Sequence, residues 1–361
     1  MKLYKRFAAV AAAALMSLSL TACGDTSWVY KTDSNTVSSG VYLGYLTQAY
    51  IGGQSSEDYD STIKNIWKQK IDDMSYKDYV NKTAEESSKR YLAVSQKFDE
   101  MGLELSEEDL SSIDMQAEMM WGYGYQQYFQ PNGTSLESYK KMLTSSMKES
   151  AIFDAYYGEG GLEEVSKDTL IKNLKENYVD INYFEMSFAQ DDKSVLPSSE
   201  IEALKKQAEE YADRINSGEN TFNEVKTEYD DEVAKKEAEE NDEEFTATDP
   251  EDIKKDEDTK ELYSKDSTSM SEDFTTAVFE DIETGKATVI TVDTSYYVVV
   301  KYDMDDDLDS NLEEVSGTIL SNLKGEDFEN MVTEWMNAIT INENTSALHK
   351  YSPKNIVMPE N

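Results

Sequence analysis

Hydrophobic and polar positions change their pattern several times along this chain, and each pattern predicts a different structure. Residues 7–20 form an apolar run behind a basic head. Residues 24–40 are polar and rich in Ser and Thr, which predicts a flexible tether. Across residues 41–160 apolar side chains recur at helical spacing, so this part should be helical and include a helix over 63–71. The spacing is clearest at Ile63, Ile66, Trp67 and Ile71, and at Tyr91, Val94 and Phe98.

From Val179 onward, apolar residues recur at every second position, so a strand is expected there. Residues 179–188 carry apolar side chains on both parities, so this strand should be buried on both faces. A capping sequence at 199–202 then starts a helix that runs to about Asn216. After a short helix at 274–279, two more strands are predicted at 288–292 and 295–302, which completes a small β-α-β unit.

Two further segments follow the same logic. Residues 228–261 are dominated by acidic side chains and are poor in apolar ones, so they should form a solvated insertion. Beyond an acidic linker at 303–309, apolar residues at helical spacing predict two helices, 312–323 and 328–339. The expected fold class is α+β.

Composition narrows the choice of partner. The chain of 361 residues carries 74 acidic and 34 basic side chains and a net charge of −40, which excludes nucleic acid as a partner because phosphates would be repelled. With 39% apolar residues it can still bury a core, and its length suggests two domains. No motif calls for a cofactor, and none is expected.

The basic head and apolar run have the form of a secretory signal peptide. Residues 20–23, Leu-Thr-Ala-Cys, resemble the lipobox of bacterial lipoproteins, in which the cysteine is lipidated and becomes the first residue of the mature protein. Cys23 is the only cysteine, so the mature chain cannot form an internal disulfide. We therefore expect a protein anchored by lipid at Cys23 to the outer face of the cell membrane. An ordinary signal peptide with a chance cysteine is the alternative.

The order of elements resembles that of PrsA-type foldase lipoproteins and their periplasmic relative SurA. Three stretches carry the resemblance: 79–178, with GLELSEE at 102–108; 178–302, with MSEDFTTAVFEDIETG at 270–285 followed by DTSYYVVVK; and 312–341. The resemblance implies a helical chaperone domain, formed by both ends of the chain, with a parvulin-like prolyl-isomerase domain inserted between them. The expected boundaries are 1–22 for the signal peptide, 23–40 for the tether, 41–177 for the first helical part, 178–302 for the parvulin-like domain and 303–361 for the returning segment.

The resemblance also implies a candidate prolyl pocket. Parvulins pair two histidines inside the sheet, and the corresponding positions here hold Tyr183 and Tyr297. Met270 and Phe274 fall where parvulins place the apolar floor for a prolyl ring, although the same spacing suits ordinary core packing. The acidic or thiol group that faces the prolyl bond would fall near Asp230 or Asp231. Tyrosine can hydrogen-bond to a twisted amide, so isomerase activity stays an open hypothesis.

Two other stretches suggest binding chemistry. Residues 303–314 place oxygen-bearing side chains at the spacing of a calcium loop, but Leu308 stands where the loop needs glycine, and a solvated linker is the alternative. Residues 119–129 gather methionines and aromatic rings, which suits either a surface for unfolded chains or a helix core.

From these patterns we expect an extracytoplasmic chaperone that binds unfolded or newly exported proteins. A working prolyl isomerase with altered pocket chemistry is the second hypothesis. A solute-binding lipoprotein is the third, and it would require two α/β lobes with parallel strands.

Overall fold

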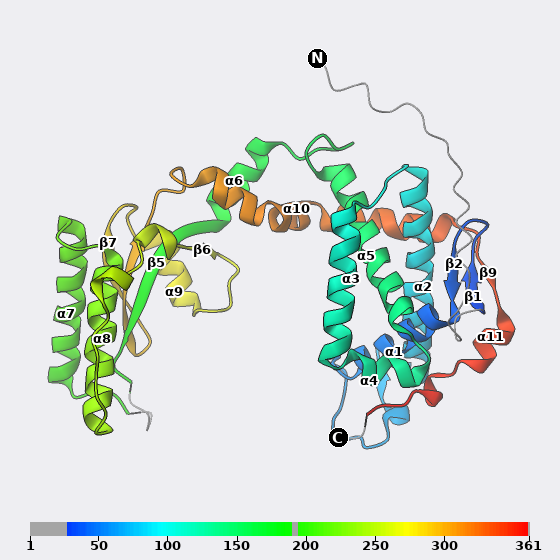
Figure 1. The fold of residues 1–361 in the computed structure, drawn as a ribbon, viewed down its shortest axis with the longest axis horizontal. Coiled ribbons are helices and arrows are strands. Elements are labelled where there is room, and N and C mark those ends of the chain that lie inside the picture. The colour runs from blue at the N-terminus through cyan, green and yellow to red at the C-terminus, as the bar shows by residue number, and fades with distance from the viewer. Residues whose placement is uncertain (1–26, 190–193, 360–361) are drawn as a thin grey trace, which may run out of the picture. The chain divides into compact units, whose positions relative to one another are not determined.

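The computed structural model describes residues 27–189 and 194–359, and its elements are labelled in Figure 1. It confirms an α+β chain. The contacts divide it into two compact units, one formed by residues 27–162 and 326–359 and the other by Glu163–Gly325. One unit is thus built from both ends of the chain and the other is inserted in the sequence between them.

The first unit is mainly helical. Its helix α1 packs with α2 and α5, and α3 packs with α5; a small sheet joins β1, β2 and β9 in the order β2-β1-β9. Its elements are β1 (Trp28–Lys31), β2 (Thr36–Ser38), α1 (Ser39–Gly53), β3 (Lys70–Ile71), β4 (Met74–Ser75), α2 (Tyr76–Glu100), α3 (Glu107–Met120), α4 (Gln126–Phe129), α5 (Leu136–Tyr157), the end of α10 (Leu308–Ala338), β9 (Asn342–Glu343) and α11 (Thr345–Lys350).

Part of the segment predicted to be a flexible tether is an ordered hairpin. Strands β1 and β2 pair antiparallel, and β9 pairs with the other edge of β1. Val29 and Val37 have no exposed surface, and Tyr30 is almost fully buried. These few apolar residues are enough to dock the hairpin on the helices, although the surrounding composition is polar. The tether prediction is therefore wrong for residues 28–38.

The helix predicted over residues 63–71 does not form. A single 3-10 turn at Ile66–Lys68 is followed by strand β3, which pairs with β4 in a short hairpin. Ile71 is buried, and Trp67 packs against the ring of Tyr76 at 6.0 Å. A turn and a hairpin thus bring these residues to the core. Four apolar residues in a short segment can therefore be buried without forming a helix.

The inserted unit contains one antiparallel sheet in the order β6-β5-β8-β7. Its elements are α6 (Lys167–Asn177), β5 (Tyr178–Ser187), α7 (Ser198–Ser217), α8 (Phe222–Glu240), β6 (Glu261–Ser264), α9 (Glu272–Thr276), β7 (Ala287–Val292), β8 (Ser295–Lys301) and the start of α10. Strand β5 is central and carries apolar side chains on both faces, as its sequence predicted.

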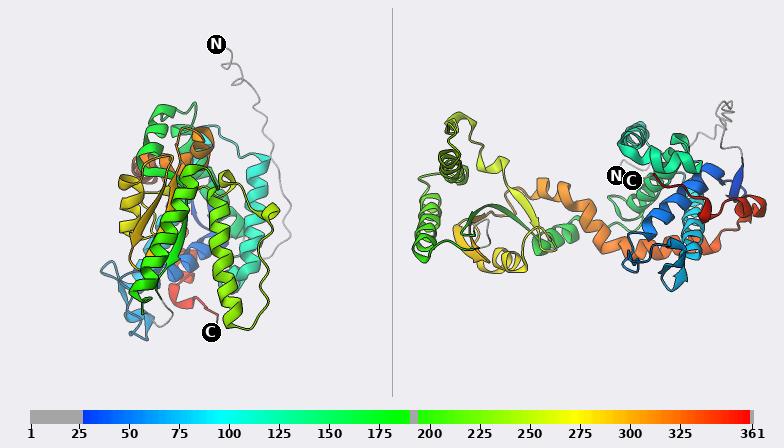
Figure 2. Two further views of the ribbon diagram at one scale, coloured as in Figure 1. Left: turned by 90° about the vertical axis from the view of Figure 1, so that its left-hand side faces the viewer. Right: turned by 90° about the horizontal axis from the view of Figure 1, so that it is seen from below.

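Each face of this sheet has its own core. Helices α7 and α8 cover one face, where Phe184 and Met186 of β5 meet Tyr211 and Phe222. Helix α9 covers the other face, where Ile181 of β5 packs with the cluster described below. Figure 2 shows the strands between these two sets of helices.

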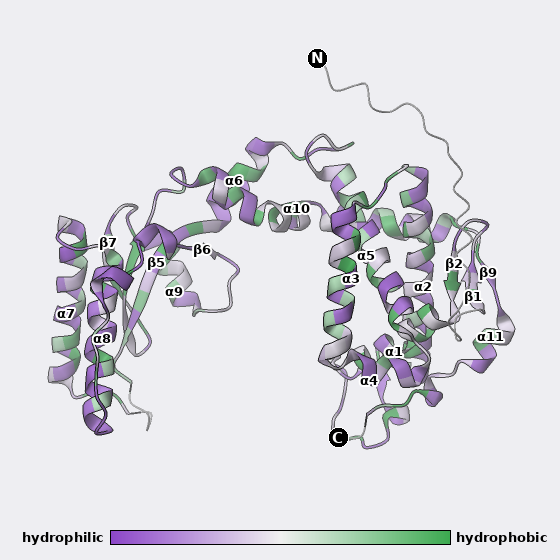
Figure 3. Cartoon of the chain, in the orientation of Figure 1, coloured by the Kyte–Doolittle hydropathy of each residue, from purple (hydrophilic) through white to green (hydrophobic). Residues whose placement is uncertain are grey.

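The acidic insertion is solvated, as predicted, but it is not irregular throughout. Helix α8 continues to Glu240, and its outer surface is largely hydrophilic (Figure 3). The chain then folds back so that the carboxylate of Asp256 accepts the backbone N–H groups of Phe222 and Asn223, each at 2.9 Å. The first four N–H groups of a helix lack acceptors within it, and Asp256 accepts two of them in α8 while the cap Thr221 accepts that of Glu224.

The two helices predicted near the C-terminus form one continuous helix, α10. Residues at its start share a buried cluster with α6, which extends the inserted unit beyond the predicted 178–302 to Glu163–Gly325. That cluster contains Leu174, Tyr178, Leu312 and Ile319.

Candidate functional site

Four of the five residues proposed for a prolyl pocket come together on the α9 face of the sheet. The ring of Phe274 lies 5.2 Å from that of Tyr183 and 5.1 Å from that of Tyr297. A third ring, that of Tyr263 on β6, lies 5.7 Å from Phe274. Ser271 caps α9 and so fixes where Phe274 enters this cluster, and Met270 packs against its margin.

This aromatic cluster is closed rather than open. Phe274 has no exposed surface and Tyr297 is 8% exposed, while Tyr183 and Met270 are half-buried. Edge-to-face contacts of this kind stabilise a core beyond the area that they bury. A prolyl ring could reach Phe274 only by displacing one of its neighbours.

The hydroxyl groups near the cluster stay protonated at neutral pH. Burial, followed by the charge of Glu185, raises the pKa of Tyr297 to about 12. Burial also raises the pKa of Tyr183, with a further contribution from Glu261. Ser295 donates a hydrogen bond of 2.5 Å to the Glu185 carboxylate. These groups can donate hydrogen bonds, but none is set up as a nucleophile.

Glu185 and Tyr263 were not predicted as site residues. Glu185 could have been found from the strand period, because it lies two residues after Tyr183 and therefore on the same face of β5. Tyr263 could not, because strand β6 has only four residues and lies next to the acidic insertion.

The fifth proposed residue, Asp230, is placed elsewhere. It is exposed on α8, and its carboxylate pairs with Lys226 one turn earlier. Helix α8 packs through Phe222 and Val225 on the face of the sheet opposite Phe274. The proposed lipidation site, Cys23, lies outside the described residues.

A pocket of about 490 Å³ opens beside the edge of β5, between α8 and the insertion. Asn182 and Tyr183 border it from the strand, and Phe222 and Ile253 supply apolar walls. Apart from Ile181, the remaining lining is polar and carries both charges: Asn223, Lys226, Thr227, Thr248, Asp252, Lys254, Thr259 and Glu261.

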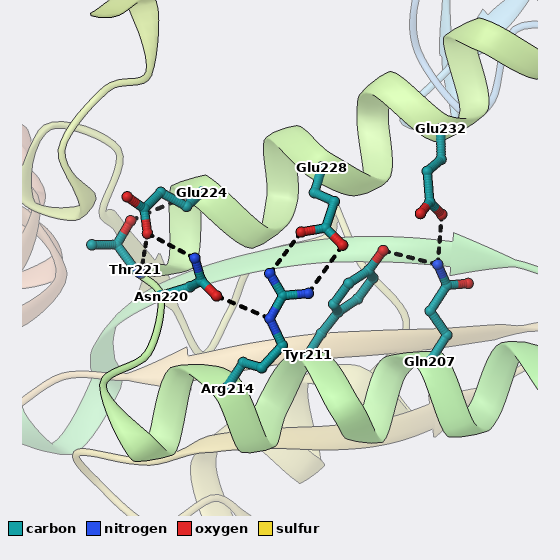
Figure 4. A network of polar contacts seen from close by, with 8 residues as sticks. All are labelled: Gln207, Tyr211, Arg214, Asn220, Thr221, Glu224, Glu228 and Glu232. Atoms are coloured by element: carbon teal, nitrogen blue, oxygen red, sulfur yellow. Dashed lines mark hydrogen bonds and ion pairs between the residues drawn. The ribbon is translucent and has the colours of Figure 1, made fainter. Parts of the chain in front are cut away.

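A polar network holds α8 against α7 and so fixes one wall of this pocket (Figure 4). The guanidinium of Arg214 donates to both oxygens of Glu228, at 3.0 and 2.6 Å, and to Asn220 at 2.9 Å. Glu228 has its pKa lowered mainly by that hydrogen-bonded pair. Further along, Gln207 donates to Glu232 at 2.6 Å. Paired N–H donors fix orientation as well as distance, so α8 is held in register with α7.

The methionine and aromatic stretch at 119–129 divides between core and surface. Phe129 is buried, and its ring stacks on that of Trp121. Trp121 begins a widened turn, Trp121–Tyr125, in which Gly124 has a φ of 113°. The same turn contains Tyr123, which faces outward and is 82% exposed. Some side chains of this stretch therefore belong to the core, and others are exposed at the surface.

Exposed apolar side chains continue along α3. Met115 is 69% exposed and Met119 is 50% exposed. The opposite side of α3 buries Ile113 and Ala117 against the unit. Met115 and Met119 are one helical turn apart and therefore lie along one side of α3, and Tyr123 follows in the widened turn directly after it. We call Met115, Met119 and Tyr123 the α3 surface.

In the stretch with calcium-loop spacing, three aspartates pair with lysines from other parts of the inserted unit. Lys260 pairs with Asp307 at 2.5 Å, Lys167 pairs with Asp309 at 2.7 Å, and Lys175 pairs with Asp305. Helix α10 already begins at Leu308, so no loop of the required length is present there. Within residues 27–189 and 194–359, no group of three or more acidic, histidine or cysteine side chains is arranged to hold a metal ion.

This geometry defines a class: an α+β chain with a helical unit formed from both ends and an inserted antiparallel sheet unit. Among solved structures the chain is similar to the foldase protein PrsA from Streptococcus pneumoniae, with 13% identity over 77% of this chain and 91% of that chain and a TM-score of 0.39. It is also similar to PrsA from Lactococcus lactis, with 15% identity, 90% and 97% coverage and a TM-score of 0.38. For PrsA from Bacillus subtilis the values are 16%, 87%, 93% and 0.31.

These three solved structures are PrsA-type foldases, the family that the sequence resembles. No protein-family model matches the chain, and no curated protein matches it. Because the identities and TM-scores are this low, the function of those proteins does not pass to this chain by similarity.

Proposed function

We propose that this protein is an extracytoplasmic chaperone, a foldase or holdase that binds partly unfolded exported proteins at the α3 surface. The observation that supports this most is the row of three large apolar side chains, Met115, Met119 and Tyr123, each at least half exposed. Contiguous exposed apolar surface commonly marks a binding site.

The chemistry of this surface suits many clients. Methionine has a flexible, polarizable side chain that adapts to irregular apolar partners, and tyrosine adds a flat ring with a polar tip. The surface is held by a rigid support, because Lys140 of α5 pairs with Asp114 at 2.9 Å and with Glu118 at 3.5 Å on α3. A fixed helix that presents adaptable side chains can bind varied sequences without reorganising its backbone.

Charge favours basic clients. The first turn of α3 carries Glu107, Glu108 and Asp109, and the whole chain has a net charge of −40. An acidic field raises the encounter rate with basic unfolded chains and keeps the chaperone itself soluble.

We propose further that the protein is anchored to the outer face of the membrane through lipid on Cys23. The support is the lipobox-like sequence at residues 20–23. Along the described parts of the chain, no helix has the length and apolar character needed to cross a bilayer. The cell would incorporate a labelled fatty acid into the wild-type protein and not into the Cys23→Ser variant; equal labelling of the two would reject the anchor.

The other two hypotheses receive less support. For the isomerase hypothesis, the ring that would form the pocket floor, Phe274, is fully buried. For the solute-binding hypothesis, parallel strands are needed, whereas every strand pair in the described residues is antiparallel.

The chaperone proposal is tested by replacing the three side chains of the α3 surface with serine. We expect the Met115→Ser, Met119→Ser, Tyr123→Ser variant to lose most of its ability to suppress aggregation of a chemically denatured client. A matched control replaces two other exposed apolar residues, Leu162 and Val357, which are 70% and 55% exposed. Equal suppression by the triple variant and the control would reject the α3 surface as the client site.

A further inference from the structure

Strand β5 has one edge that is only partly paired. On one side β8 pairs with residues 181–187. On the other side β6 pairs only with residues 178–181. Past Ser187 the chain doubles back, and the N–H of Leu196 donates to the carbonyl of Phe188 at 2.9 Å. Residues 182–187 therefore form a window that no strand of the described residues pairs with on the side away from β8.

The hydrogen-bond pattern shows which backbone groups face this window. Asp180 accepts from Tyr302 N–H at 2.8 Å, and Phe188 donates to the carbonyl of Thr294 at 2.9 Å, so even-numbered residues of β5 face β8. Because successive residues of a strand point to opposite sides, odd-numbered residues face the window. The backbone N–H and C=O groups of Tyr183 and Glu185 are thus directed toward it.

Exposed edges of this kind are usually blocked by proline, lysine or a bulge. Within residues 182–187 there is no proline or lysine, and the ladder with β8 runs without a register shift. The Glu185 carboxylate is held by Ser295 over the sheet. The window is therefore a template for one more strand.

The two sides of the window differ in chemistry. On the α8 side lies the pocket of about 490 Å³, with Phe222 and Ile253 as apolar walls. On the α9 side, Glu185 and Glu261 are exposed and lie on the face of the sheet that carries Tyr183, and Glu261 also borders the pocket. A strand added here would direct alternate side chains to these two surfaces.

We propose that the β5 window binds an extended segment of a client in which basic and apolar residues alternate, by adding it as a strand to the sheet. Backbone groups of Tyr183 and Glu185 supply the hydrogen bonds, the pocket takes apolar side chains, and the two glutamates take basic ones. This inference rests on the proposed chaperone function and names the kind of client segment that the inserted unit recognises.

Hydrogen exchange tests the geometry directly. The probe is a peptide of about six residues, a usual strand length, that alternates lysine and valine. On the full mature chain it should slow exchange of the amides of Tyr183 and Glu185, and leave those of Asn182 and Phe184 unchanged because β8 already protects them. Unchanged exchange at Tyr183 and Glu185 would overturn the proposal. So would slowing that depends on protein concentration without peptide, which would assign the window to a second copy of the chain.

A matched pair of variants separates the backbone from the side chain. Glu185→Pro and Glu185→Gln both remove the charge, but only proline removes the N–H that faces the window. Since tenfold in affinity corresponds to about 1.4 kcal/mol, close to one hydrogen bond, Glu185→Pro should bind the probe about tenfold more weakly than Glu185→Gln. Equal affinities would show that the backbone does not take part.

Failure here can be told from failure of the chaperone proposal. The triple serine variant of the α3 surface should bind the probe like the wild type, and Glu185→Pro should still suppress aggregation in part. Probe binding that disappears with the α3 surface would overturn the β5 window and leave the chaperone proposal in place.

Discussion

The ring of Phe274 meets the ring of Tyr297 edge to face at 5.1 Å, with an angle of 69° between their planes. Phe274 has no exposed surface, so this contact belongs to the core of the inserted unit. A residue of an open substrate pocket would show part of its ring to solvent. This contact therefore predicts a structural role for Phe274, whereas the family resemblance implied that it forms the floor of a prolyl pocket.

Replacing Phe274 with alanine should lower the free energy of unfolding by about 3–5 kcal/mol, because it removes a fully buried ring and leaves a cavity. Denaturant unfolding of the protein measures this loss. Met270→Ala, at the half-buried margin of the same cluster, should cost clearly less. A small effect of Phe274→Ala, together with wild-type acceleration of prolyl isomerisation above the uncatalysed rate, would restore the isomerase hypothesis.

Arg90 joins three helices that are far apart in sequence. Its guanidinium donates to Glu149 of α5 at 2.8 and 2.5 Å and to Glu329 of α10 at 2.7 and 2.6 Å. Arg90→Met leaves two neighbouring carboxylates without their cation, so we expect a loss of about 1–3 kcal/mol in the free energy of unfolding.

The same pair predicts a dependence on pH. Hydrogen bonds from Arg90 lower the pKa of Glu329 from its usual 4.5 in the folded protein. Its contribution to stability is therefore complete above the unfolded value of 4.5 and is lost as pH falls through the lower folded value. Acid titration of the unfolding midpoint should show a shallower decline below pH 4.5 for Arg90→Met than for the wild type. Parallel curves for the two proteins would contradict this assignment.

The N-terminal hairpin should matter for stability. Val29 and Val37 have no exposed surface, and alanine at either position should cost about 2 kcal/mol through lost burial and a small cavity. Thr36→Ala, at an exposed position of the same strand, is the control and should change little. If Val37→Ala behaved like Thr36→Ala in thermal unfolding, residues 28–38 would be the tether that composition alone suggested.

Asp256 should hold the acidic insertion in place. Asp256→Ala removes the acceptor for two N–H groups at the start of α8, and loss of such a cap typically costs about 1–2 kcal/mol. The released segment should then be cut faster in limited proteolysis between α8 and β6. Asp258→Ala, an exposed acid two residues further on, should leave the cleavage rate unchanged. Equal cleavage of both variants would mean that other contacts order the insertion.

Much of the inserted unit was predictable because its signals are local. Alternating apolar residues marked β5, β7 and β8, and α7 ends at Gly218, which adopts the left-handed conformation that stops a helix. Strand β6 was missed because its partner, not its own composition, makes it a strand. Leu262 and Tyr263 lie in a polar context and gain their order by pairing with Asp180 and Val179 of β5.

The prediction of two separate C-terminal helices was also wrong. The break expected between 323 and 328 does not occur: α10 continues through Gly325, because glycine inside a helix costs only about 1 kcal/mol relative to alanine. For the candidate site, the sequence predicted most of the residues that come together but not that their cluster is closed. Sequence placed Tyr183, Tyr297, Met270 and Phe274 together through the family resemblance, while the burial of Phe274 depends on Tyr263, which no pattern indicated.

The lysines that meet Asp305, Asp307 and Asp309 have a practical consequence for sample preparation. Reductive methylation, often used to promote crystallisation, keeps the positive charge of an amine, so the entry into α10 should survive it. Acetylation of amines removes that charge and would leave Asp305, Asp307 and Asp309 without their cations around the start of α10. Amine-reactive dyes and cross-linkers act in the second way. Labels for this protein are therefore better introduced at an engineered thiol, because the sequence after Cys23 contains none.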